Sequence, residues 1–132
     1  MKFKYTEFQD RFLPIVPIRI KGAEWVKFRA YVDSGAGYSV FRAEMAEILG
    51  LELENGKEKD ITVGDGFQIK VYQHKVKVDI ADRKFTAIIG FSRQLGIGFN
   101  IIGRLDIFHK FKICFDESEQ VVEFFPKLDN SD

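Results

Sequence analysis

The sequence predicts a mainly β protein, a small closed or partly closed β-barrel that carries two short helices. Short runs of alternating apolar and polar residues recur along the chain, and each is long enough for one strand. Pairs such as Asn-Gly and Asp-Gly lie between these runs and are typical of tight hairpins. A length of 132 residues, with 45% hydrophobic and 30% charged residues, suits one globular domain with a substantial core.

The first predicted strands follow an N-terminal segment, residues 1–14, that shows no clear period. Pro14 and Pro17 disfavour a helix and suit an extended strand at the edge of a sheet. A turn at residues 21–24 leads into a second strand over residues 25–32, in which apolar side chains occupy every second position. This alternation predicts that one face of the second strand is buried.

A helix is predicted over residues 41–50, which are rich in helix formers and end in a glycine suited to a C-cap. Its apolar face would comprise Met45, Ile48 and Leu49. We place the first of the two helices here.

Two hairpins are predicted next. Residues 51–54 alternate, Asn55-Gly56 is a strong two-residue turn signal, and residues 57–63 would form the returning strand. The Asp-Gly pair within residues 63–67 predicts a second tight turn. Beyond it, the apolar positions change from odd to even numbers, so we expect a bulge, a twist or a transfer between sheets near residues 71–74.

The last part of the chain predicts further strands and a second short helix. Residues 85–91 are apolar enough for a central strand, and the Ile-Ile-Gly segment at 101–103 is expected to be buried. Residues 104–109 have a short helical pattern with Leu105 and Phe108 facing inward.

The chain is expected to close with a pair of strands over residues 110–115 and 121–125. We therefore expect a single domain over residues 15–126, preceded by the N-terminal segment and followed by a polar tail at residues 127–132.

The strand over residues 25–32 ends abruptly at Asp33, which a Ser-Gly-Ala-Gly segment follows. A strand that stops at a carboxylate presents that carboxylate. The two glycines permit unusual backbone angles and the close approach of another chain. Such a turn is suited to keep a reactive group in a fixed position.

Two segments resemble the retropepsin-like family of retroviral-type aspartic proteases: Asp33-Ser34-Gly35-Ala36 and Asn100-Ile101-Ile102-Gly103-Arg104. The first matches the family's Asp-Thr/Ser-Gly loop, and the second matches its apolar-apolar-Gly-Arg segment, which runs behind that loop. With the hairpin between them in the position of the family's flap, the similarity covers roughly residues 15–126. It implies a barrel of the acid-protease type and a hydrolase, an aspartic endopeptidase.

The resemblance also assigns roles to residues, with Asp33 as the catalytic group. The active-site loop would continue through Ser34, Gly35 and Ala36. Substrate would contact Gly37, Tyr38 and Val40 beyond the loop, and Gly64, Asp65, Gly66 and Phe67 at the flap tip. Structural support for the loop would come from Ile101, Ile102, Gly103 and Arg104. The family uses no metal and no cofactor.

Peptide hydrolysis by carboxylates needs two of them, one as base toward a water and one, protonated, to support the carbonyl oxygen. This chain has one Asp-Ser-Gly segment, so the second carboxylate would be Asp33 of a second copy across a two-fold axis. A homodimer is therefore a condition of the predicted activity. Two carboxyls in such contact titrate as a pair, and we expect an acidic to near-neutral optimum.

The sequence departs from the family in its flap, which is less glycine-rich than the retroviral one, and at position 37. Retroviral members carry an acid there, which pairs with the arginine of the second segment, whereas this chain has Gly37. Arg104 would need a replacement acid, from residues 1–10 or from the second copy, because a buried unpaired guanidinium is costly.

The charge balance limits the expected partners. Twenty basic and twenty acidic side chains cancel without a long block of either sign, which argues against nucleic acid and against an anionic membrane. We expect a second copy of the chain and a peptide or protein substrate. Cys114 has no internal disulfide partner, and the first residues lack the apolar core of a signal peptide, so we expect a cytoplasmic protein.

Two other interpretations stay open. The chain can have the fold without the activity, as a dimerisation or peptide-binding module in which Asp33 is structural. Alternatively, it is an unrelated ligand-binding β-barrel in which the two segments occur together by chance.

Overall fold

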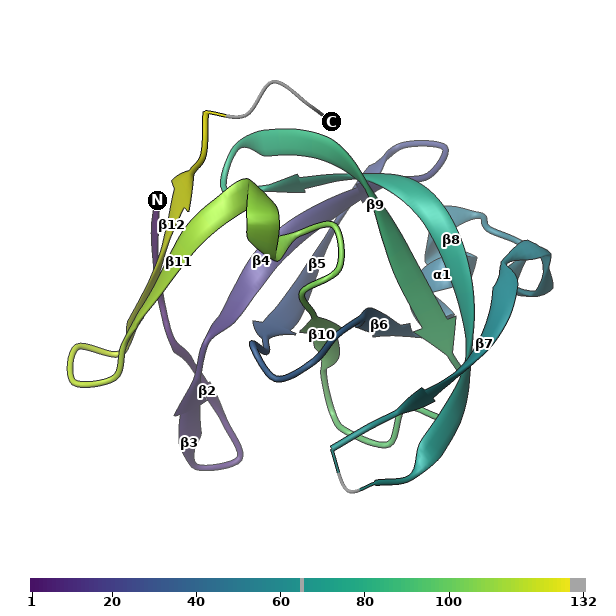
Figure 1. Ribbon diagram of the computed structural model, residues 1–132, viewed down its shortest axis with the longest axis horizontal. Coiled ribbons are helices and arrows are strands. Elements are labelled where there is room, and N and C mark those ends of the chain that lie inside the picture. Colours follow the sequence, from purple (N-terminus) through teal and green to yellow (C-terminus); the bar gives the residue numbers. More distant parts are fainter. Residues whose placement is uncertain (65, 129–132) are drawn as a thin grey trace.

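A computed structural model describes residues 1–64 and 66–128 and shows a β-barrel, as the sequence predicts (Figure 1). The strands are β1 (Lys2–Lys4), β2 (Thr6–Phe8), β3 (Arg11–Leu13), β4 (Ile15–Lys21), β5 (Trp25–Val32), β6 (Ser39–Arg42), β7 (Lys57–Thr62), β8 (Gln68–Ile80), β9 (Arg83–Ser92), β10 (Asn100–Ile102), β11 (Phe111–Asp116) and β12 (Val121–Pro126). The helical elements of the described residues are α1 (Ala43–Leu49) and the 3-10 helices η1 (Leu53–Asn55) and η2 (Phe108–Lys110).

The barrel is a seven-stranded sheet in the order β4-β5-β10-β6-β9-β8-β7, which an additional pairing between β4 and β8 closes. Closure occurs where Arg19 pairs with Asp79 and Ile20 pairs with Val78. The predicted edge strand β4 is thus an edge only over its first residues. The mainly β fold class is confirmed.

Strands β4 and β5 form the predicted hairpin, and β5 spans the predicted residues 25–32. Along β5 the side chains of Phe28, Ala30 and Val32 are buried, whereas those of Lys27 and Arg29 are exposed. The period of two therefore points one face of the strand into the barrel.

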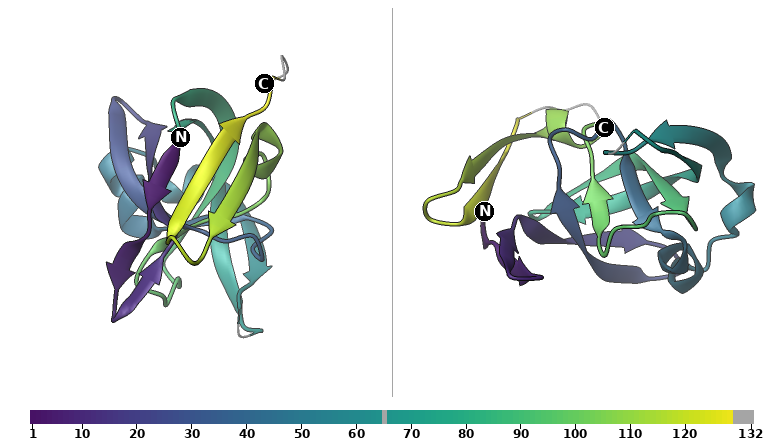
Figure 2. Two further views of the ribbon diagram at one scale, coloured as in Figure 1. Left: turned by 90° about the vertical axis from the view of Figure 1, so that its left-hand side faces the viewer. Right: turned by 90° about the horizontal axis from the view of Figure 1, so that it is seen from below.

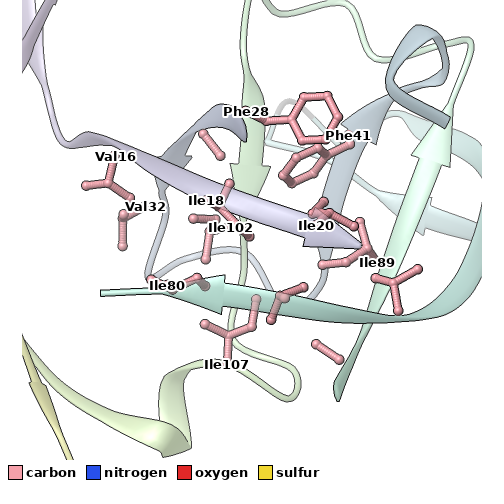
Figure 3. Packing of buried hydrophobic residues seen from close by; sticks show 14 of the residues in the cluster. Val16, Ile18, Ile20, Phe28, Val32, Phe41, Ile80, Ile89, Ile102 and Ile107 are labelled. Carbon is pink, nitrogen blue, oxygen red and sulfur yellow. The ribbon is translucent and has the colours of Figure 1, made fainter. Parts of the chain in front are cut away.

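The barrel interior is filled by one large apolar cluster (Figure 3). Its fully buried members in that view include Val16, Ile18, Ile20, Phe41, Ile80, Ile89, Ile102 and Ile107. A second, smaller cluster of Val40, Ile61, Ile69 and Val71 packs beneath the hairpin formed by β7 and β8. This smaller cluster lies beside Asp33, since Val40 and Ile61 border the same cavity as Asp33.

Strand β8 explains the change in apolar parity that the sequence shows. Val71 packs into the smaller cluster, and Val76 and Val78 pack into the large one. Residues 68–73 pair with β7, and residues 72–80 pair with β9, so β8 changes partners at the point where its buried face changes. Both registers are continuous and both partners belong to the one seven-stranded sheet, so the predicted bulge and the predicted transfer between sheets are wrong.

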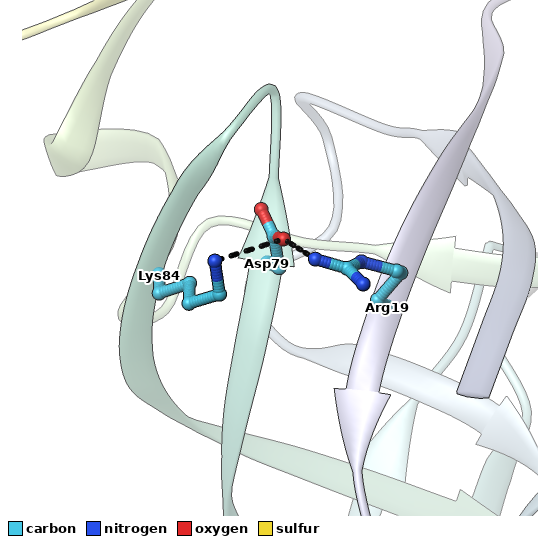
Figure 4. A network of polar contacts seen from close by, with 3 residues as sticks. All are labelled: Arg19, Asp79 and Lys84. Atoms are coloured by element: carbon cyan, nitrogen blue, oxygen red, sulfur yellow. Dashed lines mark hydrogen bonds and ion pairs between the residues drawn. The ribbon is translucent and has the colours of Figure 1, made fainter. Parts of the chain in front are cut away.

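A buried carboxylate marks the closure of the barrel (Figure 4). Asp79 is 7% exposed and forms an ion pair and a hydrogen bond with Arg19, and its Oδ2 lies 3.7 Å from Lys84 Nζ. A buried carboxylate requires such partners, and they fix the register between β4 and β8.

The predicted helix exists, but it begins at Ala43, because Ser39–Arg42 form strand β6 between β9 and β10. Gly50 caps it in a left-handed conformation with φ 77°, as expected for a C-cap. The predicted apolar face is wrong at Ile48, which is 59% exposed, since Ala46 is the buried position on that turn.

The predicted hairpin at Asn55-Gly56 is wrong. Asn55 is the last residue of η1, and Gly56 is the C-cap of this helix. Strand β7 pairs with β8 instead of with residues 51–54. Gly56 lies against His74, whose Nε2 would be 2.5 Å from a Cβ at position 56. Packing against β8 therefore overrides the local turn signal.

The second predicted helix is a short 3-10 helix that begins later, at Phe108. Leu105 does not face inward, since it is 37% exposed, and the fully buried side chain here is Ile107. Asp106 adopts a positive φ of 66°, which interrupts the helical pattern before η2.

The N-terminal residues form β1 to β3, and β1 lies beside β12, far away in the sequence (Figure 2). Strands β1, β12 and β11 form a three-stranded sheet, in which the predicted pair β11 and β12 turns at residues 117–120. Within the described residues, no helix has the length and apolar character needed to cross a bilayer.

Candidate active site

Asp33 lies directly after β5, at the start of the loop that leads to β6. Its backbone N–H donates to the carbonyl of Ile102 at 3.0 Å. Strand β10 runs parallel to the end of β5, with Ile102 opposite Val32, and so continues alongside the loop. The parallel pairing fixes the position at which Asp33 leaves the sheet.

The loop is braced by its own hydrogen bonds. The N–H of Gly35 donates to Asp33 Oδ1 at 2.9 Å, and the N–H of Ala36 donates to the Asp33 carbonyl at 3.1 Å. Asp33 itself is half-buried, whereas Ser34 and Gly35 are exposed. One carboxylate oxygen is thus oriented by the loop backbone.

The second segment supports the loop from behind. Arg104 and Leu105 donate their backbone N–H groups to the carbonyls of Ala36 and Gly37, each at 2.9 Å. A Cβ at Gly103 would lie 2.2 Å from the carbonyl oxygen of Tyr38. The supporting segment and the Asp33 loop therefore pass too closely for any residue other than glycine at position 103.

Ser39 is a supporting residue that the sequence did not indicate. Its hydroxyl oxygen accepts the N–H of Gly103 at 2.9 Å, and the side chain is 1% exposed. Buried serine hydroxyls require such a partner. Nothing in a Tyr-Ser-Val segment distinguishes this serine from one in an ordinary turn.

The guanidinium of Arg104 is not buried, contrary to expectation. The residue is exposed, and its Nη1 donates to the carbonyl of Ser34 at 2.7 Å. None of the acids among the described residues of this chain forms an ion pair with it, so residues 1–10 do not supply the replacement acid. With Gly37 in place of an acid, a backbone carbonyl serves as the acceptor.

Two cavities meet at Asp33. The first has a volume of about 550 Å³ and the second about 580 Å³. The residues that border both are Asp33, Val63, Gly64 and Ile101. Asp33 therefore lies at the junction of a cleft that the β7–β8 hairpin covers on one side.

The two cavities differ in chemistry. The first is bordered by Tyr38, Val40, Ile61 and the charged residues Lys59 and Asp60, among others. The second is mostly apolar and aromatic, with Tyr31, Phe67, Ile69, Leu95, Ile97 and Phe99 among its borders. Burial raises the pKa of Tyr31, and the nearby Asp33 carboxylate raises it further.

The tip of the β7–β8 hairpin has the predicted tight turn. Val63 donates its N–H to the carbonyl of Phe67 at 2.9 Å, and Gly66 donates to Val63 at 2.8 Å. Gly66 has a φ of 89°, which favours glycine. Asp65, another predicted site residue, lies outside the described residues.

The structure brings together most of the predicted site residues but not all of them. The ones that border the cleft are Asp33, Gly35, Ala36, Gly37, Tyr38, Val40, Gly64, Phe67 and Ile101. Ser34, Gly66, Ile102, Gly103 and Arg104 do not border either cavity. The four members of this second set other than Gly66 lie in the Asp33 loop or in the segment that supports it.

Sequence reasoning missed part of the cleft lining. The sequence predicts Lys59 and Ile61 only as part of a returning strand, and it gives no role to Leu95, Ile97 and Phe99, which lie outside the predicted elements. Apolar residues in a glycine-containing loop are a weak signal, which gains meaning only when β10 places that loop beside Asp33. Among the described residues, no group of three or more His, Cys, Asp or Glu side chains is arranged to bind a metal ion.

Comparisons with known proteins agree with this architecture. No protein-family model matches the sequence, and no curated protein matches it. Many solved structures match at the level of fold, the following two among them. A retropepsin-like aspartic protease from Rickettsia conorii has a TM-score of 0.65 and 18% identity, over 92% of this chain and 97% of that chain. The EIAV protease complexed with the inhibitor HBY-793 has a TM-score of 0.58 and 18% identity, over 79% of this chain and 92% of that chain.

The predicted retropepsin-like fold is thus confirmed. The barrel is not of an unrelated fold, which answers the structural part of the second alternative that the sequence left open.

Proposed function

We propose that the protein is an aspartic endopeptidase that hydrolyses peptide bonds through a water molecule activated by a pair of Asp33 carboxylates. The observation that supports this most is the place of Asp33, at the junction of two cavities and on a loop tied to β10. The likeness to two proteases adds support at the level of fold only.

The second carboxylate of the proposed pair is Asp33 of a second copy. Two carboxyl groups within hydrogen-bonding distance share one proton, because both cannot ionise cheaply. The ionised member removes a proton from water as the oxygen attacks the substrate carbonyl, and the protonated member donates to the carbonyl oxygen. The first carboxyl then passes the proton it took from water to the leaving nitrogen as the C–N bond breaks, and the other carboxylate takes a proton back from a hydroxyl of the intermediate, which restores the pair.

The exposed side of the loop supports dimerisation in this proposal. Ser34 and Gly35 are exposed, although they belong to the motif, and the backbone of this side is already stiffened by Arg104. A two-fold axis beside Asp33 would cover these residues and let the Ser34 hydroxyl brace the loop of the partner.

The β7–β8 hairpin is the proposed flap, with its tip at Gly64, Asp65, Gly66 and Phe67. An extended peptide in the cleft would lie beneath it, where backbone groups can bind the peptide as they bind a neighbouring strand. Closing the hairpin over the peptide would also exclude water, which strengthens the polar interactions inside.

The test is cleavage of a mixed peptide library by wild type and by Asp33→Asn, from roughly pH 4 to 7, where carboxylate pairs work. We expect the substitution to lower cleavage by about 100-fold or more, because it removes the ionisable pair and preserves the shape. Asp82→Asn is the matched control, since Asp82 lies in the exposed β8–β9 turn and borders neither cavity.

Two outcomes would contradict the proposal. Cleavage that survives in Asp33→Asn would show that the activity does not depend on this carboxylate. Cleavage by a strict monomer in sedimentation would show that no second Asp33 is needed. A stable dimer without cleavage would favour the peptide-binding module instead.

A further inference from the structure

Strand β7 points one lysine into the first cavity. Because side chains alternate along a strand, Lys59 shares a face with Ile61, which is 7% exposed and packs in the smaller cluster beside Tyr38. Lys59 is half-buried, and its Nζ lies 4.8 Å from the centre of the Tyr38 ring. The ammonium group is therefore positioned over an aromatic ring in the wall of the cleft.

The charges nearest to Lys59 in β7 are Glu58, which faces away from the cleft, and Asp60, which borders the first cavity. Glu58 lies on the opposite face of β7, and its Oε1 is 3.2 Å from Lys70 Nζ. Asp60 alternates onto the same face of β7 as Glu58 and stands opposite Lys70 in the strand register, although it contributes to the border of the first cavity. Among the described residues, no carboxylate forms an ion pair with Lys59.

The second cavity has no comparable cation. Its borders are apolar or aromatic apart from Asp33, Gln94 and backbone at glycines. The two cavities beside Asp33 are therefore suited to different side chains. A positive charge in one of them changes which peptide fits the cleft.

We propose that the cavity between Tyr38 and Lys59 binds a carboxylate of the substrate, so that the site selects peptides with an acidic residue at that position. This inference rests on the proposed endopeptidase function. A carboxylate there would form a charge-assisted hydrogen bond with Lys59 Nζ, partly shielded from water by Tyr38. The apolar second cavity would accept a large apolar side chain on the same peptide.

The two-fold axis of the proposed dimer extends the inference. Each copy contributes one such cavity, and the two lie on opposite sides of the bond that is cut. The preferred sequence would therefore have an acidic residue on both sides of that bond.

The test compares peptides that differ only in Glu against Gln, one position at a time, with wild type, Lys59→Met and Lys59→Glu. Wild type should cleave the Glu peptide about tenfold faster in kcat/KM at one position on each side, as expected for a charge-assisted hydrogen bond. Lys59→Met should lose this preference, and Lys59→Glu should favour a Lys peptide instead. Lys57→Met is the control, because Lys57 is an exposed lysine of β7 outside both cavities.

A carboxylate also occurs at the C-terminus of a peptide. Each peptide is therefore made with a free and with an amidated C-terminus. A preference that follows the amidation, and not the Glu, would overturn selection of an acidic side chain and assign the cation to the peptide end.

Failure of the inference and failure of the proposed function give different results. Cleavage by wild type with equal rates for Glu and Gln peptides would overturn the carboxylate site and leave the endopeptidase intact. If nothing is cut, binding of fluorescent Glu and Gln peptides decides. Tighter binding of the Glu peptide that Lys59→Met abolishes would support the carboxylate site and overturn the endopeptidase, and equal binding would overturn both.

Discussion

Two hairpins flank the cleft, and they differ in what their tips contact. Hairpin β2–β3 and the tip of β7–β8 both extend toward the lower edge of Figure 1. The first ends against other aromatic rings. The second places Phe67, which is 71% exposed, at its tip. The β2–β3 hairpin thus packs a ring against the border of the cleft, whereas the ring at the tip of β7–β8 is mostly exposed.

The β2–β3 hairpin supports the second cavity from outside. The rings of Phe8 and Phe99 are 5.1 Å apart, and Phe99 is also 5.1 Å from Tyr31, which borders the cavity with it. Gly98 passes beneath Phe8, with only 2.6 Å between its would-be Cβ and Phe8 Cζ. A chain of three rings therefore connects this hairpin to the cleft.

The β7–β8 hairpin is packed where Ile61, Ile69 and Val71 meet in the smaller cluster. At the tip, a Cβ at Gly64 or Gly66 would have no atom within 4 Å. The difference indicates a division of roles. Under the proposed function, the β2–β3 side would fix the shape of the second cavity, and the exposed tip of β7–β8 would leave room for a peptide to enter.

The substitution Phe8→Ala is the strongest test of the difference between the two hairpins. Removing this ring should destabilise the protein by about 2 kcal/mol, less than for a fully buried phenylalanine, because Phe8 is half-buried. Phe99 would lose its support, so KM for peptides with a large apolar residue should rise several-fold with little change in kcat. Urea unfolding and steady-state kinetics measure the two effects.

Phe12→Ala is the control for this experiment. Phe12 lies in the same hairpin but is 47% exposed, so its removal should change stability by less than about 0.5 kcal/mol. If Phe8→Ala and Phe12→Ala behave alike, hairpin β2–β3 does not support the cleft.

A smaller effect is expected at the tip of β7–β8. Gly66→Ala should lower stability by about 1 kcal/mol, because its φ of 89° disfavours a side chain. Gly64→Ala has neither this conformation nor a close neighbour, so its stability should be unchanged. Gly64 borders both cavities, however, and its new methyl group should raise KM. Thermal unfolding and kinetics separate the two variants, and equal destabilisation would contradict an exposed, unpacked tip.

The last effect concerns Tyr5, at the base of hairpin β2–β3, and is visible only at high pH. Burial, together with the hydrogen bond from its hydroxyl to Glu117 Oε1, raises the pKa of Tyr5 from 10.0 to about 12. The folded protein keeps this proton where the unfolded chain loses it. Stability is therefore complete below pH 10 and should fall as the pH rises toward 12.

Tyr5→Phe removes the titrating group. The variant should show a flatter decline of melting temperature over that pH range than wild type. A decline of equal slope in both proteins would assign the alkaline sensitivity to other groups.

Sequence reasoning predicts the strands of the barrel well where the period is clear. Strand β5 and its end before Asp33 follow from strict alternation between interior and solvent. Strand β6 was missed because all of Ser39, Val40 and Phe41 are buried, so it has no alternation, and the adjacent helix signal extends over it. The β2–β3 hairpin was missed because its turn uses Gln9 and Asp10 at positive φ, without a glycine.

The candidate site likewise has a part that the sequence predicts and a part that it does not. Its loop and the supporting segment are local patterns, and the close approach of Gly103 to Tyr38 explains why a glycine stands there. The walls of the cleft depend on which strands become neighbours. Lys59 gains its position from the pairing of β7 with β8, whereas Phe99 gains its position from β10, which pairs with the distant β5.

The ion pair at the closure of the barrel bears on how quickly the chain folds and unfolds. Hairpins β4–β5 and β8–β9 join residues close in sequence, whereas Arg19 and Asp79 are 60 positions apart. Long separations carry a larger loop-closure entropy, so we expect this contact to form late, after the hairpins. Contacts made after the transition state act mainly on the unfolding rate. Arg19, Asp79 and Lys84 would then determine how long the closed barrel persists before it opens.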